Sequence, residues 1–237
     1  MTGMDADRLV LLQGLRDTRS TFERWAAHPS RILVPWLLGA LAIAIALLTS
    51  VWVIATSVQP DPSTTLLAGL NAPADGDAIG RILFRNSLVL ALHALACVAG
   101  FIAGASLPLQ IEHKTGFSRV LHEKAGPFAI AFVTAATLFS LVTQAWVLGS
   151  IGADVALQLA ISPHTLILTL LPHAIPELVG LFLPLAAWLI ASRRDEWDEL
   201  LAATFVTVAI AIPLVVGAAF IEVHWWPDLL RAASPIY

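Results

Sequence analysis

The sequence is poor in charged residues and in cysteine, and both shortages limit what the chain can be. Only 13% of its 237 residues are charged, whereas 58% are hydrophobic. Soluble domains carry about 25% charged and 45–50% apolar residues, so this balance predicts an integral membrane protein whose first partner is the lipid bilayer. The net charge of −4 gives no basic footprint for nucleic acid, and we expect no nucleic-acid partner.

The single cysteine, Cys97, lies inside an apolar run. It cannot form an intrachain disulfide, and a structural zinc site is not expected where no cysteine cluster occurs. The sequence also lacks a serine nucleophile elbow, a phosphate loop and paired catalytic aspartates, which are patterns that mark common enzyme classes. We therefore predict a protein that is not an enzyme and that carries no metal or cofactor.

Long apolar runs are what the sequence has in abundance. A bilayer crossing takes about 20 apolar residues. Four segments reach that length once: Ile32–Val58, Leu88–Leu109, Pro127–Ser150 and Leu201–Trp226. A further tract, Val155–Ala191, is nearly twice as long. It has room for two crossings, or for one crossing and a shorter helix.

The distribution of basic residues decides how often the long tract crosses. Lysine and arginine are dense before the first span, within residues 110–126 and at Arg193-Arg194, and they are absent from residues 151–163. Cytoplasmic loops carry the excess of basic residues, which predicts a cytoplasmic N-terminus, a single crossing by the long tract and a C-terminus outside. A partial or re-entrant helix around Pro163–Leu171 is then expected before the fourth crossing.

The predicted fold is an all-α, polytopic membrane helix bundle with five transmembrane helices. Residues 5–29 alternate leucine or valine with arginine, a spacing typical of an amphipathic helix with a basic face. Such a helix lies on the inner membrane surface or packs on the rest of the protein. We divide the chain into this N-terminal helix, residues 1–31, and a transmembrane domain, residues 32–237.

Six polar side chains interrupt the apolar segments at a similar predicted depth. Glu177 lies sixteen residues before Arg193, which places it roughly 24 Å above the cytoplasmic end of its helix. The other five fall in the same outer half of their spans: Asn86, His93, Gln144, His173 and Glu222. A charged residue at the helix centre costs roughly 2.5–3.5 kcal/mol on insertion scales. We therefore expect these residues to form one polar intramembrane cluster.

The backbone around Glu177 is predicted to break. Pro176 has no N–H, and its ring would clash with the carbonyl of Pro172 in a continuous helix. A helix that restarts near Pro176 would place Glu177 in its first turn, where the helix dipole favours a carboxylate. Unwound segments at membrane depth often mark binding sites in transporters.

Three roles stay open for the cluster. It can be hydrogen-bonded contact between helices, a proton, ion or substrate site, or a metal site formed by His93, His173, Glu177 and Glu222. The metal site is the least favoured, because Pro176 breaks the helical spacing on which a fingerprint such as HExxH depends.

Elsewhere, Gly100 and Gly104 form a small-xxx-small pair that lets another helix approach, within the chain or in a homo-oligomer.

Three stretches resemble the stage II sporulation protein M family. They are Arg85-Asn86, Leu171-Pro172-His173 followed by Glu177-Leu178, and Ala219-Phe220-Ile221-Glu222. The resemblance covers roughly Ile82–Pro227 and departs from the family at Ala174, where a glycine usually follows the histidine. It implies an integral membrane scaffold of a peptidoglycan-degrading complex, whose partner proteins carry the enzymatic activity. Many relatives occur in organisms that do not sporulate.

Two functions follow as expectations. The first is a scaffold or assembly protein of a cell membrane, such as the bacterial inner membrane, that organises other membrane or envelope proteins. The alternative is a proton- or cation-linked transporter or channel-like protein that uses Glu177 and Glu222.

Overall fold

The computed structural model describes residues 18–63, 76–102 and 117–236, with only the backbone described over 117–129. Its elements follow in the order α2 (Pro29–Ser57), α3 (Gly76–Phe101), α5 (Phe117–Gln158), α6 (Pro163–Arg194), η3 (Trp197–Glu199), α7 (Leu200–His224) and α8 (Trp226–Ala233). Residues 18–27 are also helical. No strand occurs in these described ranges. The predicted all-α class is confirmed.

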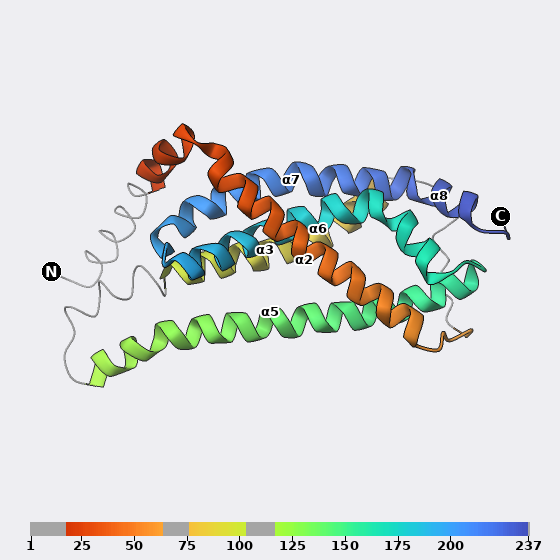
Figure 1. Cartoon of the computed structure of the whole chain (residues 1–237), viewed down its shortest axis with the longest axis horizontal. Coiled ribbons are helices and arrows are strands. Elements are labelled where there is room, and N and C mark those ends of the chain that lie inside the picture. Colours follow the sequence, from red (N-terminus) through yellow and green to blue (C-terminus); the bar gives the residue numbers. More distant parts are fainter. Residues whose placement is uncertain (1–17, 64–75, 103–116, 237) are drawn as a thin grey trace.

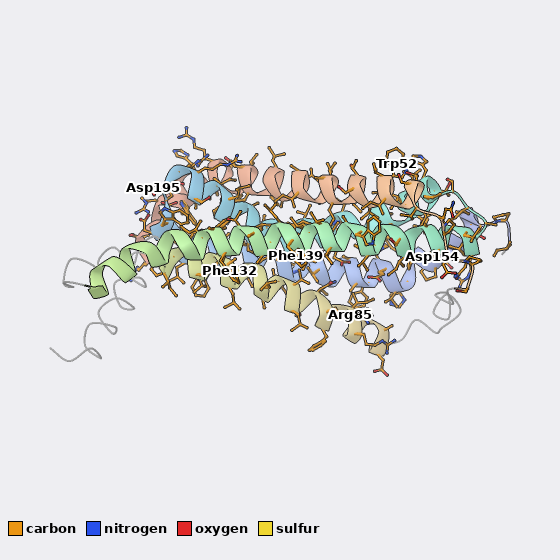
Figure 2. The ribbon with its side chains drawn as sticks, turned by 90° about the horizontal axis from the view of Figure 1, so that it is seen from below. Trp52, Arg85, Phe132, Phe139, Asp154 and Asp195 are labelled. Carbon is orange, nitrogen blue, oxygen red and sulfur yellow. The ribbon has the colours of Figure 1, made fainter. Side chains whose placement is uncertain are left out.

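Five helices of the described residues are long and apolar enough to cross a membrane, namely those in α2, α3, α5, α6 and α7. This confirms the predicted number and indicates a multi-pass membrane protein. The helices run along the length of one elongated bundle (Figure 1). Asp195 marks one end, and Trp52 and Asp154 mark the other (Figure 2). We call these the Asp195 end and the α8 end.

Two helices begin earlier than their apolar runs. α3 begins at Gly76 rather than near Leu88. α5 begins at Phe117, so the predicted span Pro127–Ser150 starts inside the helix rather than at its beginning. Hydropathy marks the part of a helix at membrane depth, whereas the helix itself continues for as long as its backbone bonds are satisfied. α2 and α7 agree closely with their predicted spans.

α6 is one helix from Pro163 to Arg194, with Pro172 and Pro176 inside it. The predicted separate helix over Pro163–Leu171 is not confirmed, because these residues form the first turns of α6. The prediction that Glu177 lies in a first turn is wrong for the same reason. Ser162 precedes the helix as its N-cap, and its hydroxyl accepts a hydrogen bond from the Thr165 N–H. Figure 1 shows α6 bending in its first half, which is how helices commonly accommodate proline.

α6 forms the centre of the bundle. Residues 180–188 are buried without interruption, and α2, α3, α5, α7 and α8 all contact α6. Lipid tails are as apolar as leucine, so helices in a membrane associate through close van der Waals packing of small residues. α2 presents such a face, with Trp36, Ala40, Ala44, Leu47, Val51 and Ala55 buried.

Glycines allow the closest helix crossings. A Cβ atom on Gly149 of α5 would lie 2.6 Å from Ile54 Cβ on α2. A Cβ atom on Gly100 of α3 would lie 2.7 Å from Trp188 Nε1 on α6, so Gly100 packs within the chain. Gly104, its predicted companion, lies outside the described residues.

Residues 18–27 pack on the Asp195 end of the bundle. Arg24 Nη2 donates to Glu199 Oε1 at 2.9 Å. The rings of Trp25 and Trp36 meet edge to face with centroids 5.2 Å apart, and Thr21 is only 1% exposed. For these residues the geometry favours a helix that packs on the protein. The rest of the predicted amphipathic helix lies outside the described residues, and its contact with the membrane surface stays a prediction.

We expect Gly149→Ala to lower the free energy of unfolding by about 1–3 kcal/mol, because the added methyl overpacks the α2–α5 crossing. Gly217→Ala is the matched control, since nothing lies within 4 Å of its added Cβ and alanine favours a helix by up to about 1 kcal/mol over glycine. Thermal unfolding of the detergent-purified proteins measures both. Equal stability of the two variants would contradict the close crossing.

Candidate functional site

A cleft of about 300 Å³ opens between α2, α5 and α6 towards the α8 end. Its polar lining comes from His173 and Glu177 of α6, Glu222 of α7 and Trp226 of α8. Its other walls are apolar and include Leu47, Leu48, Val51, Leu148, Ile151, Val155, Leu166, Ile167, Leu170 and Leu178. The cleft therefore has one polar side and one aliphatic side.

Glu177 and Glu222 bring two carboxylates to this cleft from neighbouring helices. Their charges act on each other, and the Asn86 side chain of α3 lies close enough to Glu177 to interact with its carboxylate. Arg85 attracts Glu222 from an exposed position on α3 but does not line the cleft. Four predicted residues thus meet here: Asn86, His173, Glu177 and Glu222.

Three buried polar atoms around the cleft have no hydrogen-bond partner in the described structure. They are Asn86 Nδ2, His173 Nδ1 and Trp226 Nε1. The exposed fractions of Asn86 and His173 are only 9% and 5%. Most buried polar atoms in proteins are paired, and an unpaired one costs about 1–3 kcal/mol. Three such atoms beside two carboxylates mark the cleft as a place where a bound group would complete the hydrogen bonding.

Trp226 was not predicted to belong to the site. Its ring meets the His173 ring at a centroid distance of 5.4 Å, near an edge-to-face geometry. Trp226 was predicted to end the last span, and α8 was not predicted, although Pro227 and Asp228 at its start and Arg231 near its end are typical helix-terminus residues. These residues could have predicted α8 from the sequence.

α8 is fixed against the turn between α5 and α6, and this places Trp226 over the cleft. Leu230 is fully buried and packs with Ala156, Leu159 and Leu166. Beyond the helix, Ser234 Oγ donates to the Leu159 carbonyl oxygen at 2.6 Å. The C-terminal segment is therefore part of the site's framework.

His93 and Gln144 do not line the cleft. His93 Nδ1 lies 2.7 Å from the Leu181 carbonyl oxygen, and because a carbonyl only accepts, this nitrogen carries the proton. Cys97 Sγ, one turn further along α3, donates to the Pro184 carbonyl at 3.1 Å. These two bonds tie α3 to α6. Gln144 Nε2 donates to Ser140 Oγ on its own helix.

The described residues contain no group of three or more His, Cys, Asp or Glu side chains that could hold a metal ion. His93 is turned to the α6 backbone, so the metal set considered from the sequence does not assemble around one point. The site supports binding through carboxylates, an amide, an imidazole and an indole N–H.

Comparison of the chain with known protein families, characterised proteins and solved structures finds no match. The resemblance to the stage II sporulation protein M family stays a prediction from the sequence.

We expect His93→Ala to destabilise the protein by at least about 1–3 kcal/mol, because it leaves the buried Leu181 carbonyl without its donor. Gln144→Ala removes a bond within one helix, so its effect should stay within about 0.5 kcal/mol. Thermal unfolding in detergent compares the two. If Gln144→Ala destabilises the protein as much as His93→Ala, the distinction between a bond that joins two helices and a bond within one helix is wrong.

Proposed function

We propose that the protein is a transporter-like membrane protein in which Glu177 and Glu222 hold a proton or a cationic ligand. The observation that carries this proposal is the convergence of both carboxylates on one cleft. Ionisable residues within transmembrane segments are costly, and they typically face a cavity and mark proton or substrate pathways.

The unpaired atoms favour this function over purely structural contact between helices. A polar cluster that only holds helices together is stabilising when its members satisfy one another, and it is unfavourable when half-satisfied. Here Glu177 and Glu222 line the same cleft, and His173 and Trp226 each keep an unpaired buried nitrogen. A bound cation or proton would lower the cost of placing two carboxylates in one cleft.

The orientation that we propose follows from basic residues. Arg19, Arg24, Arg31, Arg193 and Arg194 gather at the Asp195 end of the described chain. By the positive-inside rule this end is cytoplasmic, and the N-terminus lies with it. The α8 end and the C-terminus are then outside a cell membrane, and the cleft lies in the outer half.

We expect Glu177→Gln to abolish proton- or cation-coupled flux while leaving the fold intact, because glutamine keeps the shape but not the charge. The measurement uses purified protein in liposomes with an imposed pH or cation gradient. Thermal unfolding checks the fold, and Gln144→Ala is the control for a polar residue outside the cleft. Flux through Glu177→Gln equal to that of the unsubstituted protein would rule out a role for this carboxylate.

A scaffold function is the second candidate, and the shape of α5 favours it. α5 spans 42 residues, about twice what a crossing needs, so one end projects beyond the membrane core. Its contacts are mainly with α2, and its outward face carries Phe132 and Phe139, which are 64% and 74% exposed. Both are labelled on α5, which lies in front of the other helices in Figure 2. A partner membrane protein of the kind the family resemblance implies would pack along this face.

A photo-crosslinking residue in place of Phe139 tests the scaffold function in native membranes. The expected result is a discrete protein adduct, with mass spectrometry distinguishing a different envelope protein from a second copy of this chain. The control places the crosslinker at Leu95 of α3, which is similarly exposed, at 63%. Adducts of lipid alone at both positions would leave the scaffold function without support.

A further inference from the structure

The cleft has the layout of a site for an amphiphile. On one side it presents two carboxylates, an imidazole and an indole N–H, and on the other it presents aliphatic side chains of α2 and α5. A bare proton or metal cation would use only the polar side. The aliphatic side has a use when the ligand carries a hydrocarbon part, because binding then buries apolar surface at about 25 cal/mol per Å².

The charge of the polar side selects the headgroup. Glu177 and Glu222 both line the cleft, whereas Arg85, which attracts Glu222, is exposed and lies outside the lining. Two carboxylates in a cleft whose lining holds no cation are unfavourable at membrane depth. An ammonium group has three N–H donors and one positive charge, and it would bond to both carboxylates at once.

The unpaired atoms add a second requirement. Trp226 Nε1 is a donor without an acceptor, and an ammonium group cannot accept. An oxygen a few bonds away from the ammonium would accept from this indole N–H. His173 Nδ1, also unpaired and in a side chain only 5% exposed, gives or accepts a proton according to its tautomer.

The size of the cleft limits how much of a ligand it can hold, so a long hydrocarbon tail must extend beyond it. A cleft of about 300 Å³ is at the lower limit of small-molecule pockets, so it takes a headgroup and a few carbons. A second cavity of about 470 Å³ lies between α2 and α5, and Leu47 lines both. Its lining is apolar except for Ser50. α2 and α5 diverge from their crossing towards the Asp195 end (Figure 1).

We propose that the cleft binds the ammonium headgroup of an amphiphilic amine, with its hydrocarbon tail in the α2–α5 cavity. This inference rests on the proposed function and names the class of its ligand. The amine has two possible sources with the same chemistry, a membrane lipid with a primary-amine headgroup or a soluble long-chain amine.

Binding to the purified full chain tests the headgroup. Dodecylamine should bind at least roughly tenfold more tightly than dodecanol, because a hydrogen bond to a charged group contributes about 1.5–3 kcal/mol. Glu177→Gln and Glu222→Gln should each remove most of that difference, whereas Gln144→Ala should leave it unchanged. The proposal is overturned if the amine and the alcohol bind equally well. It is also overturned if neither glutamine variant changes the affinity for the amine. Both outcomes are measured on folded protein.

Ala46→Trp tests the tail. Ala46 is exposed and lines the α2–α5 cavity, so a tryptophan fills that cavity from its rim without replacing a core residue. It should weaken binding of dodecylamine and spare that of butylamine, whose chain is too short to reach. If Ala46→Trp weakens binding of both amines to the same degree, or of neither, the proposed path of the tail is overturned.

Lipid competition distinguishes the two sources. Phosphatidylethanolamine should displace dodecylamine if the natural ligand is a lipid, and phosphatidylglycerol with the same tails, which lacks an amine, should not. Displacement by neither assigns the site to a soluble amine. Displacement by both overturns selection of the ammonium. The flux assay distinguishes failure of this inference from failure of the proposed transport function. If flux depends on Glu177 but no amine binds, only the amine inference is refuted. If an amine binds but no flux occurs, only the transport function is refuted.

Discussion

Close packing around α6 is the constraint on which the rest of the structure depends. Residues 180–188 are buried on every side, so each neighbouring helix is positioned by how near it can come to this segment. Small residues set that distance. A Cβ atom on Gly180 would lie only 3.2 Å from the Ala211 carbonyl oxygen of α7, and a Cβ atom on Gly39 of α2 only 3.2 Å from Ala186 Cβ. α7 carries Glu222, so the approach at Gly180 also brings the second carboxylate to the cleft.

Proline explains why α6 can be both central and irregular. Pro184 lies in the buried run and Pro172 and Pro176 in the part that lines the cleft, yet the helix continues through all three. In a membrane, neighbouring side chains re-satisfy backbone groups that proline disturbs. His93 and Cys97 bond to carbonyls in this stretch of α6, those of residues 181 and 184. Considered within its own helix alone, each proline predicts a break, whereas the structure has a bend.

Hydropathy and basic residues were enough to predict the number of spans, because both depend on composition over about 20 residues. The common depth of the polar residues was also useful: Asn86, His173, Glu177 and Glu222 do meet. Depth alone does not give the direction in which a side chain points around its helix axis. His93 faces the α6 backbone, and Gln144 sits on α5, which approaches the bundle chiefly through α2. Only tertiary packing separates these two residues from the other four.

The attachment of the C-terminal segment has a practical consequence. Ser234 is bonded to Leu159, and Leu230 of the same segment packs beneath the α5–α6 turn, while Trp226 at the other end of α8 lines the cleft. A substitution that loosens this segment, far along the chain from Glu177, would displace one wall of the cleft. Binding measured on such a variant would report the attachment of the segment as well as the chemistry of the site.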